Sequence, residues 1–129
     1  MDTRVDRRTG LAVYTATGPI GREEVIAGIE RMYADPDFRP GLNALWDFRG
    51  ASLWAMTGED IRAIIDFVAE NRDRRGSGRS ALLGPEDLTY GMMRMAQSLG
   101  EGKLDVSMRV FRDLDEAMDW VLPEEEGPP

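Results

Sequence analysis

Hydrophobic and polar positions follow two different periods along the chain, and each change of period marks an expected element. The segments Thr3–Arg8 and Leu11–Thr17 alternate with the two-residue period of strands on either side of a Thr9-Gly10 turn, which predicts a β-hairpin. From Gly21 the apolar residues recur at helical spacing, with acids in the first turn, until Asp35-Pro36. This segment is therefore predicted to be a helix.

The remaining sequence alternates between strand and helix patterns. Three more strands are expected, at Leu42–Phe48, Arg79–Leu83 and Val106–Arg112. Three more helices are expected, beginning at Thr57, at Glu86 and after Asp113, and Arg49–Met56 is expected to be a loop. This order predicts an α/β fold with a mixed, mainly parallel sheet, an antiparallel first strand at its edge and about four helices. We expect one domain over residues 1–122 and a frayed acidic tail over residues 123–129.

Capping signals support two of the helices. Thr57 precedes Asp60 by three residues, as in a capping box with Asp in place of the usual Glu, and Asp113 stands in the same relation to Glu116. The helix that begins at Thr57 is expected to end at Gly76, after a run of arginines that complements its dipole.

Composition restricts the chemistry more than it identifies it. The 129 residues contain no His and no Cys, which excludes His-based triads, Cys nucleophiles, disulfides and zinc–thiolate sites. A net charge of −8 argues against a nucleic-acid partner, because neutralising phosphates needs a basic face. Neither a membrane span nor the apolar region of a signal peptide is evident, so we expect a cytoplasmic protein. No cofactor and no metal site are predicted.

Four segments resemble one known group of small domains. They are Leu45-Trp46-Asp47-Phe48-Arg49, Thr57-x-x-Asp60-Ile61, Tyr90-Gly91-Met92-x-Arg94-Met95 and Val110-Phe111-Arg112-Asp113-x-x-Glu116-Ala117-x-x-Trp120. Over roughly residues 3–122 the chain resembles the SpoIIAA-like group of STAS/SEC14-type domains, most of which are bacterial. The resemblance implies a mixed sheet and two possible roles. One is that of an anti-sigma-factor antagonist, a partner-binding module switched by phosphorylation, and the other is the binding of a lipid or hydrophobic ligand.

The phosphorylation switch can be compared residue by residue. The resemblance implies an Asp-Ser-[Ser/Thr]-Gly element at the start of the second helix, where this chain has Ala55-Met56-Thr57-Gly58. Only Thr57 and Gly58 match. Thr57 is therefore either a phosphoacceptor or anion-binding hydroxyl, or a plain helix cap, and the cap is the interpretation we favour.

The candidate binding residues are apolar side chains close to one edge of the expected sheet. Large aromatic and methionine side chains suit adaptable apolar pockets, although they also suit a core, to which we assign Trp46. Gly91 within a helix suggests the close approach of a ligand, a loop or another chain. The predicted ligand- or partner-binding residues are Leu53, Trp54, Met56, Thr57, Tyr90 and Met93.

Two charged groups are weaker candidates. Acids follow several expected strands, where ligands bind in parallel sheets, but the first turns of helices also favour acids. These acids are Asp47, Glu86, Asp87, Asp113 and Asp115. A basic cluster of Arg72, Arg74, Arg75 and Arg79 is either a site for an acidic partner or a solvated helix end, and we favour the latter.

Three hypotheses of function follow, in this order. The first is a non-catalytic STAS-like module that binds a protein partner or itself as a homodimer. The second is a carrier or sensor of a small apolar or lipid-like molecule. The third, a carboxylate-dependent metal enzyme, ranks last because no nucleophile can be named, and we predict no catalytic residue.

Overall fold

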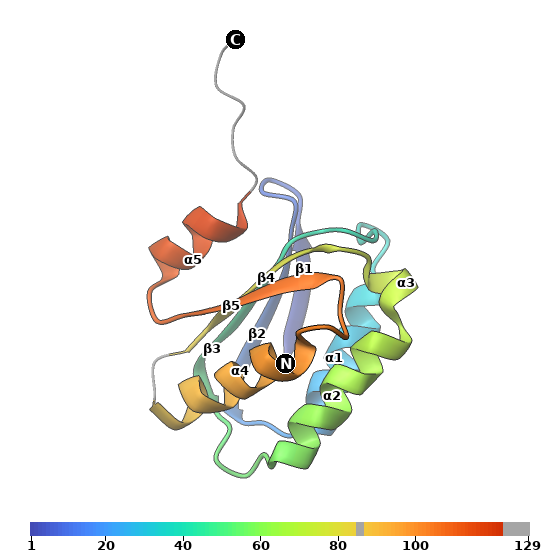
Figure 1. Ribbon diagram of the computed structural model, residues 1–129. Helices are drawn as coiled ribbons and strands as arrows, with labels where there is room; N and C mark the ends of the chain where they lie inside the picture. Colours follow the sequence, from blue (N-terminus) through green and yellow to red (C-terminus); the bar gives the residue numbers. More distant parts are fainter. Residues whose placement is uncertain (85–86, 123–129) are drawn as a thin grey trace.

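The computed structural model describes residues 1–84 and 87–122, and for residues 87–89 it describes the backbone alone. Figure 1 shows its strands and helices. They are β1 (Asp2–Asp6), β2 (Leu11–Pro19), α1 (Arg22–Ala34), β3 (Ala44–Ser52), α2 (Gly58–Glu70), α3 (Arg72–Arg75), β4 (Gly78–Leu83), α4 (Asp87–Gly100), β5 (Val106–Phe111) and α5 (Leu114–Val121). The predicted acidic tail at residues 123–129 lies outside the described residues.

The five strands form one sheet in the order β1-β2-β3-β4-β5. β1 pairs antiparallel with β2, as the hairpin predicts, and the other neighbours pair in parallel. The prediction of a mixed, mainly parallel sheet with an antiparallel edge strand is therefore confirmed.

The strand order decides which helix covers which face. Since neighbouring parallel strands are joined by right-handed crossovers, consecutive helices lie on the same side of the sheet. Figure 1 shows α1, α2 and α4 against one face and α5 against the other. Two apolar clusters result, a large one under the three helices and a smaller one under α5. We call the face under α1, α2 and α4 the three-helix face.

β3 is longer than predicted, because Arg49–Ser52 continue the strand in place of the expected loop. β3 has one extra residue opposite β2, since Thr15 pairs with Asp47 but Thr17 pairs with Gly50. Such a β-bulge reverses the alternation of side chains beyond it. Leu53, which follows the bulge, is buried in the same cluster as Phe48.

The second expected helix is also interrupted. α2 ends at Glu70, where the Asn71 side chain donates a hydrogen bond to the Phe67 carbonyl (2.8 Å). The four residues Arg72–Arg75 then form the separate helix α3, which ends at Gly76 with a φ of 71°. The described residues therefore form five helices, of which α3 is a single turn.

Both predicted N-caps are present, but only the one at Thr57 forms the full capping box. Thr57 Oγ1 accepts a hydrogen bond from the Asp60 amide (3.1 Å), and Asp60 Oδ2 accepts one from the Thr57 amide (2.9 Å), which completes a capping box. At α5, an Asp113 carboxylate oxygen accepts from the Glu116 amide (3.0 Å).

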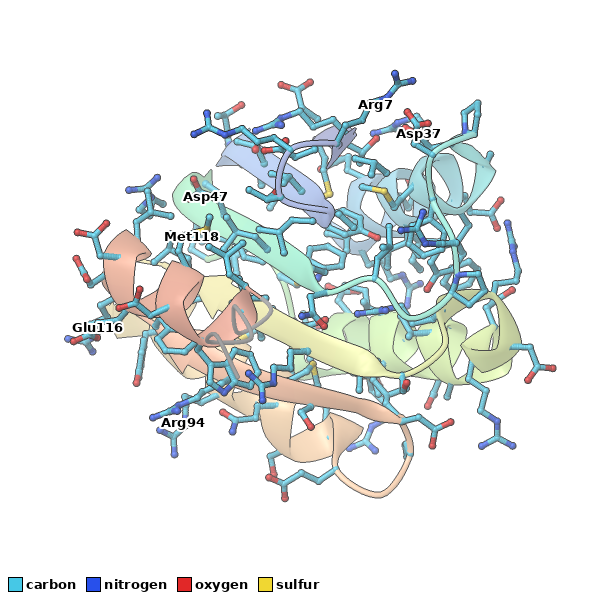
Figure 2. All side chains as sticks on the ribbon, turned by 90° about the horizontal axis from the view of Figure 1, so that it is seen from above. Arg7, Asp37, Asp47, Arg94, Glu116 and Met118 are labelled. Carbon is cyan, nitrogen blue, oxygen red and sulfur yellow. The ribbon has the colours of Figure 1, made fainter. Side chains whose placement is uncertain are left out.

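Polar contacts fasten the peripheral segments to the sheet. Asn43 Nδ2 donates to the Val121 carbonyl of α5 (2.8 Å), and the Arg79 guanidinium donates to the Trp120 carbonyl (2.8 Å). Figure 2 shows Arg7 of the hairpin turn beside Asp37, with which it forms an ion pair of 3.0 Å. These contacts hold α5 against the ends of β3 and β4, and the hairpin turn against the segment that follows α1.

Candidate functional site

A cavity of about 90 Å³ lies between the three-helix face of the sheet and the helices. Strands β2 to β5 provide its floor, and α1, α2 and α4 provide its walls. Trp46 stands in the floor and stacks on Tyr14, with a centroid separation of 3.6 Å and an interplanar angle of 2°. The cavity therefore lies at the centre of the larger apolar cluster.

The cavity wall is almost entirely apolar and contains several adaptable side chains. Ile61, Ile64 and Ile65 of α2 line the cavity, and they belong to the apolar stripe that predicts this helix in the sequence. The methionines in the lining are Met56, Met92, Met93 and Met108. Because unbranched methionine side chains repack readily, this wall can fit ligands of somewhat different shape.

One end of the cavity carries a buried charge. Arg75, the last residue of α3, is only 6% exposed. Its Nη1 donates hydrogen bonds to the carbonyls of Leu42 (2.8 Å) and Ser77 (3.2 Å), and its Nη2 donates to Ser80 Oγ (3.1 Å). Among the side chains that the structure describes, no carboxylate forms an ion pair with this guanidinium.

The chain after α3 explains why Arg75 lies inside. The Arg75 carbonyl accepts a hydrogen bond from the Gly41 amide (2.9 Å). Gly76 packs so tightly against the same segment that a Cβ on it would lie 2.6 Å from the Gly41 nitrogen. This close approach, together with the positive φ of Gly76, requires glycine there. The tight turn fixes the backbone of Arg75 with its side chain directed towards β4.

Two tyrosines share the cavity with Arg75. Burial raises the pKa of Tyr14 and of Tyr33, and the charge of Arg75 partly opposes this rise in each case. Burial lowers the pKa of Arg75, which nevertheless stays protonated at neutral pH. Among the hydrogen bonds of the described residues, none involves either tyrosine hydroxyl. The polar end of the cavity thus combines one cation with two phenol groups.

The structure gathers three of the six predicted binding residues and separates the other three. Leu53, Met56 and Met93 are buried and line the cavity. Trp54 is 72% exposed, and Thr57 is the helix cap described above. Neither of them lies in the cavity wall.

Tyr90, the sixth predicted binding residue, also lies outside the cavity wall. It is half-buried, and the Arg112 guanidinium lies 4.3 Å from its ring centroid. Next to it, Gly91 is exposed, and in the described structure a Cβ on it would meet nothing within 4 Å. The neighbouring loop suggested by this glycine is therefore not found there.

The charged candidates hold contacts of other kinds. Asp47, labelled in Figure 2, pairs with Arg49 at 2.9 Å, and Asp113 caps α5. Glu86 and the side chain of Asp87 lie outside the described residues. Among the acidic side chains that are described, no group of three or more could hold a metal ion. The prediction that Arg75 belongs to a solvated basic cluster is wrong, because the turn at Gly76 directs it inward.

Sequence reasoning missed the polar end of the cavity. The sequence pattern places Tyr14 and Ser80 in strands and Tyr33 in a helix, without marking any of them as a binding residue. It places Arg75 in a run of arginines that is expected to be exposed. Alternation in Leu11–Thr17 does place Tyr14 between Ala12 and Ala16 on one face, a signal that a large side chain there has small neighbours. No comparable signal in the sequence marks Arg75.

Comparisons with known proteins support the fold. No family model matches the chain, and no match was found among curated proteins. The chain is similar to a crystal structure of an uncharacterised DUF3478-family protein with a SpoIIAA-like fold from Shewanella loihica PV-4. The match has a TM-score of 0.59 and 15% sequence identity, and it covers 93% of this chain and 90% of the other. The chain therefore has a SpoIIAA-like fold, as its motifs suggest. No helix in the described residues is long and apolar enough to span a membrane.

Proposed function

We propose that this SpoIIAA-like domain binds a small apolar molecule in the cavity beneath α1, α2 and α4. The observation that carries the proposal is the cavity itself, whose wall is nearly all apolar and includes Leu53, Met56 and Met93. Among the described side chains, no Asp or Glu lines it. Such a wall suits binding better than acid–base chemistry, so we propose a non-catalytic role.

The volume limits the size of the ligand. An engineered apolar cavity of about 150 Å³ accepts benzene. At about 90 Å³ this cavity accepts a single ring only if a methionine side chain moves, and it accepts a short branched chain more readily. A ligand whose apolar part has the bulk of one methyl-substituted ring is therefore the upper limit that we propose.

The methionines allow a direct test by NMR of protein labelled with [¹³C-methyl]methionine. Four of the eight methionines line the cavity, and the four that lie outside its lining serve as internal controls. The controls are Met1, Met32, Met95 and Met118. On titration with toluene, we expect the four lining methyl signals to shift in a saturable manner and the controls to stay in place. If the lining signals do not move up to the solubility limit of toluene, the proposal is wrong.

A second candidate function is association with a protein partner or a second copy through Trp54. The observation that favours it is the indole, which is 72% exposed in the segment before α2. Met95, the other exposed large apolar side chain (42%) of the described residues, would lie 3.6 Å from a Cβ on Gly58, the first residue of α2. Sedimentation equilibrium of wild type and Trp54→Ser tests self-association. Oligomers that the substitution abolishes would support it, whereas a wild-type monomer over the accessible concentration range would contradict it.

A further inference from the structure

The buried guanidinium of Arg75 bears on what kind of molecule the cavity takes. A buried cation is ordinarily paired with an anion, because removing a charge from water costs free energy that hydrogen bonds to neutral groups only partly recover. The three acceptors of Arg75 are two backbone carbonyls and one hydroxyl, and all are neutral. The cation therefore lies in the cavity lining without an anionic partner among the described residues.

The donors of Arg75 are not exhausted by these contacts. A guanidinium carries five N–H donors. Nη1 uses both of its hydrogens on Leu42 and Ser77, and Nη2 uses one on Ser80. Nε and the second hydrogen of Nη2 are left without a protein acceptor in the described part of the chain. A guanidinium with two such donors can bind both oxygens of a carboxylate.

Two further donors lie at the same end of the cavity. Tyr14 and Tyr33 both line the cavity, and each is close enough to Arg75 to interact electrostatically with its charge. Neither hydroxyl donates to a described protein group. The cavity thus has an apolar body and one end at which a cation and two hydroxyls can all donate hydrogen bonds.

We propose that the ligand of this cavity is a small apolar carboxylic acid, whose carboxylate is held by Arg75 with Tyr14 and Tyr33 and whose hydrocarbon part lies among the methionines. This inference rests on the proposed binding function and adds the chemical class of the ligand. Ser80 is a positioning residue, since its hydroxyl fixes the guanidinium through a 3.1 Å hydrogen bond. A charge-neutral ligand of the same shape would leave the cation unpaired.

The experiment compares acids with neutral ligands of the same shape. Benzoate with benzamide, and 4-methylpentanoate with 4-methylpentanamide, are titrated at pH 7 into [¹³C-methyl]methionine-labelled protein. We expect each acid to bind at least about tenfold more tightly than its amide, which is the ordinary effect of a hydrogen bond to a charged group. The shifts should again be confined to the four methionines that line the cavity.

Two variants test whether Arg75 is the anchor. Arg75→Met keeps an unbranched side chain and removes the charge, so the preference for acid over amide should disappear. Tyr33→Phe keeps the ring and removes only the hydroxyl, so it provides a second test in case Arg75→Met does not fold. It should reduce the preference for acid over amide severalfold. Arg72→Met, on the exposed side of the same short helix, is the matched control and should leave the preference unchanged.

The outcomes separate the two proposals. If toluene and the amides bind and the acids bind no more tightly, the carboxylate inference is overturned while the cavity function stands. A preference for acids that survives in both Arg75→Met and Tyr33→Phe also overturns it, since the anion is then held elsewhere. If no probe moves the lining methyl signals, both proposals fail.

Discussion

The capping box at Thr57 leads to a prediction that separates a structural role from a regulatory one. Thr57→Ala removes the Oγ1 that accepts the Asp60 amide at 3.1 Å, whereas the reciprocal bond from the backbone amide at 57 to Asp60 can remain. Replacing a threonine N-cap by alanine costs about 0.5–2 kcal/mol. Because this cap is exposed and water can solvate the freed amide, we expect a loss of about 1 kcal/mol.

The assay is urea unfolding followed by tryptophan fluorescence. The midpoint should fall while the m-value stays constant, since the surface exposed on unfolding does not change. For 129 residues the entropy of unfolding is about 0.27 kcal/mol/K, so a loss of 1 kcal/mol lowers Tm by about 4 °C. Thr57→Ser and Thr57→Asp retain an oxygen acceptor and should stay within about 0.5 kcal/mol of wild type.

A double-mutant cycle with Asp60→Ala completes the test. The two residues form one reciprocal motif, so their effects should be non-additive by about 0.5 kcal/mol or more. An alanine variant as stable as wild type, together with additive effects in the cycle, would refute the assignment of Thr57 as a cap. A Thr57→Asp variant as unstable as Thr57→Ala would refute the reasoning about the oxygen acceptor.

Three further predictions concern glycine, the cavity and pH. Gly91→Ala should raise the free energy of unfolding by about 0.5–1 kcal/mol, because alanine is favoured over glycine within a helix and a Cβ there meets nothing within 4 Å. A lower free energy of unfolding, measured by urea denaturation, would contradict this. Ala96→Leu should fill part of the cavity, stabilise the protein by about 0.5–2 kcal/mol and suppress the methionine shifts caused by toluene. An unaltered toluene titration in that variant would contradict the location of the site. Partial burial raises the pKa of Asp47, but hydrogen bonds from Arg49 outweigh this and hold the pKa below its ordinary value of 3.8. The stability that Asp47 contributes is therefore complete above about pH 3.8 and is lost as the pH falls through the lower folded-state value. In Arg49→Ala the pKa of Asp47, measured by NMR titration, should rise, and an unchanged value would show that Arg49 is not the cause.

Local patterns in the sequence were sufficient for most of the fold. The two-residue alternation of Leu11–Thr17 and the helical stripe after Thr57 each reflect one buried face, so the period alone identifies the element. Strand and helix order then predicts a parallel sheet, because parallel neighbours need crossover connections. The caps at Thr57 and Asp113 were also readable, since capping depends on residues only three positions apart.

The candidate site depended much more on long-range packing. Leu53, Met56 and Met93 were predicted as binding residues because of their type and expected location, and all three line the cavity. The continuation of β3 through Ser52 was missed, because Arg49–Ser52 become a strand only by pairing with β2 across a bulge. The role of Trp46 in the cavity floor was missed for a similar reason, since a core residue and a cavity residue have the same pattern.

Arg75 shows most clearly where the sequence alone is insufficient. In sequence it is one of three arginines in a four-residue stretch, and nothing in its neighbours separates it from the exposed Arg72 and Arg74. Its burial results from the contact of Gly76 with Gly41, which are 35 positions apart, and from the strand order that places Ser80 beside α3. The sequence determined which elements form and where they begin, because those depend on local periodicity and capping. Only the tertiary structure decided which side chains meet around the cavity, because that depends on how strands and helices distant in sequence pack together.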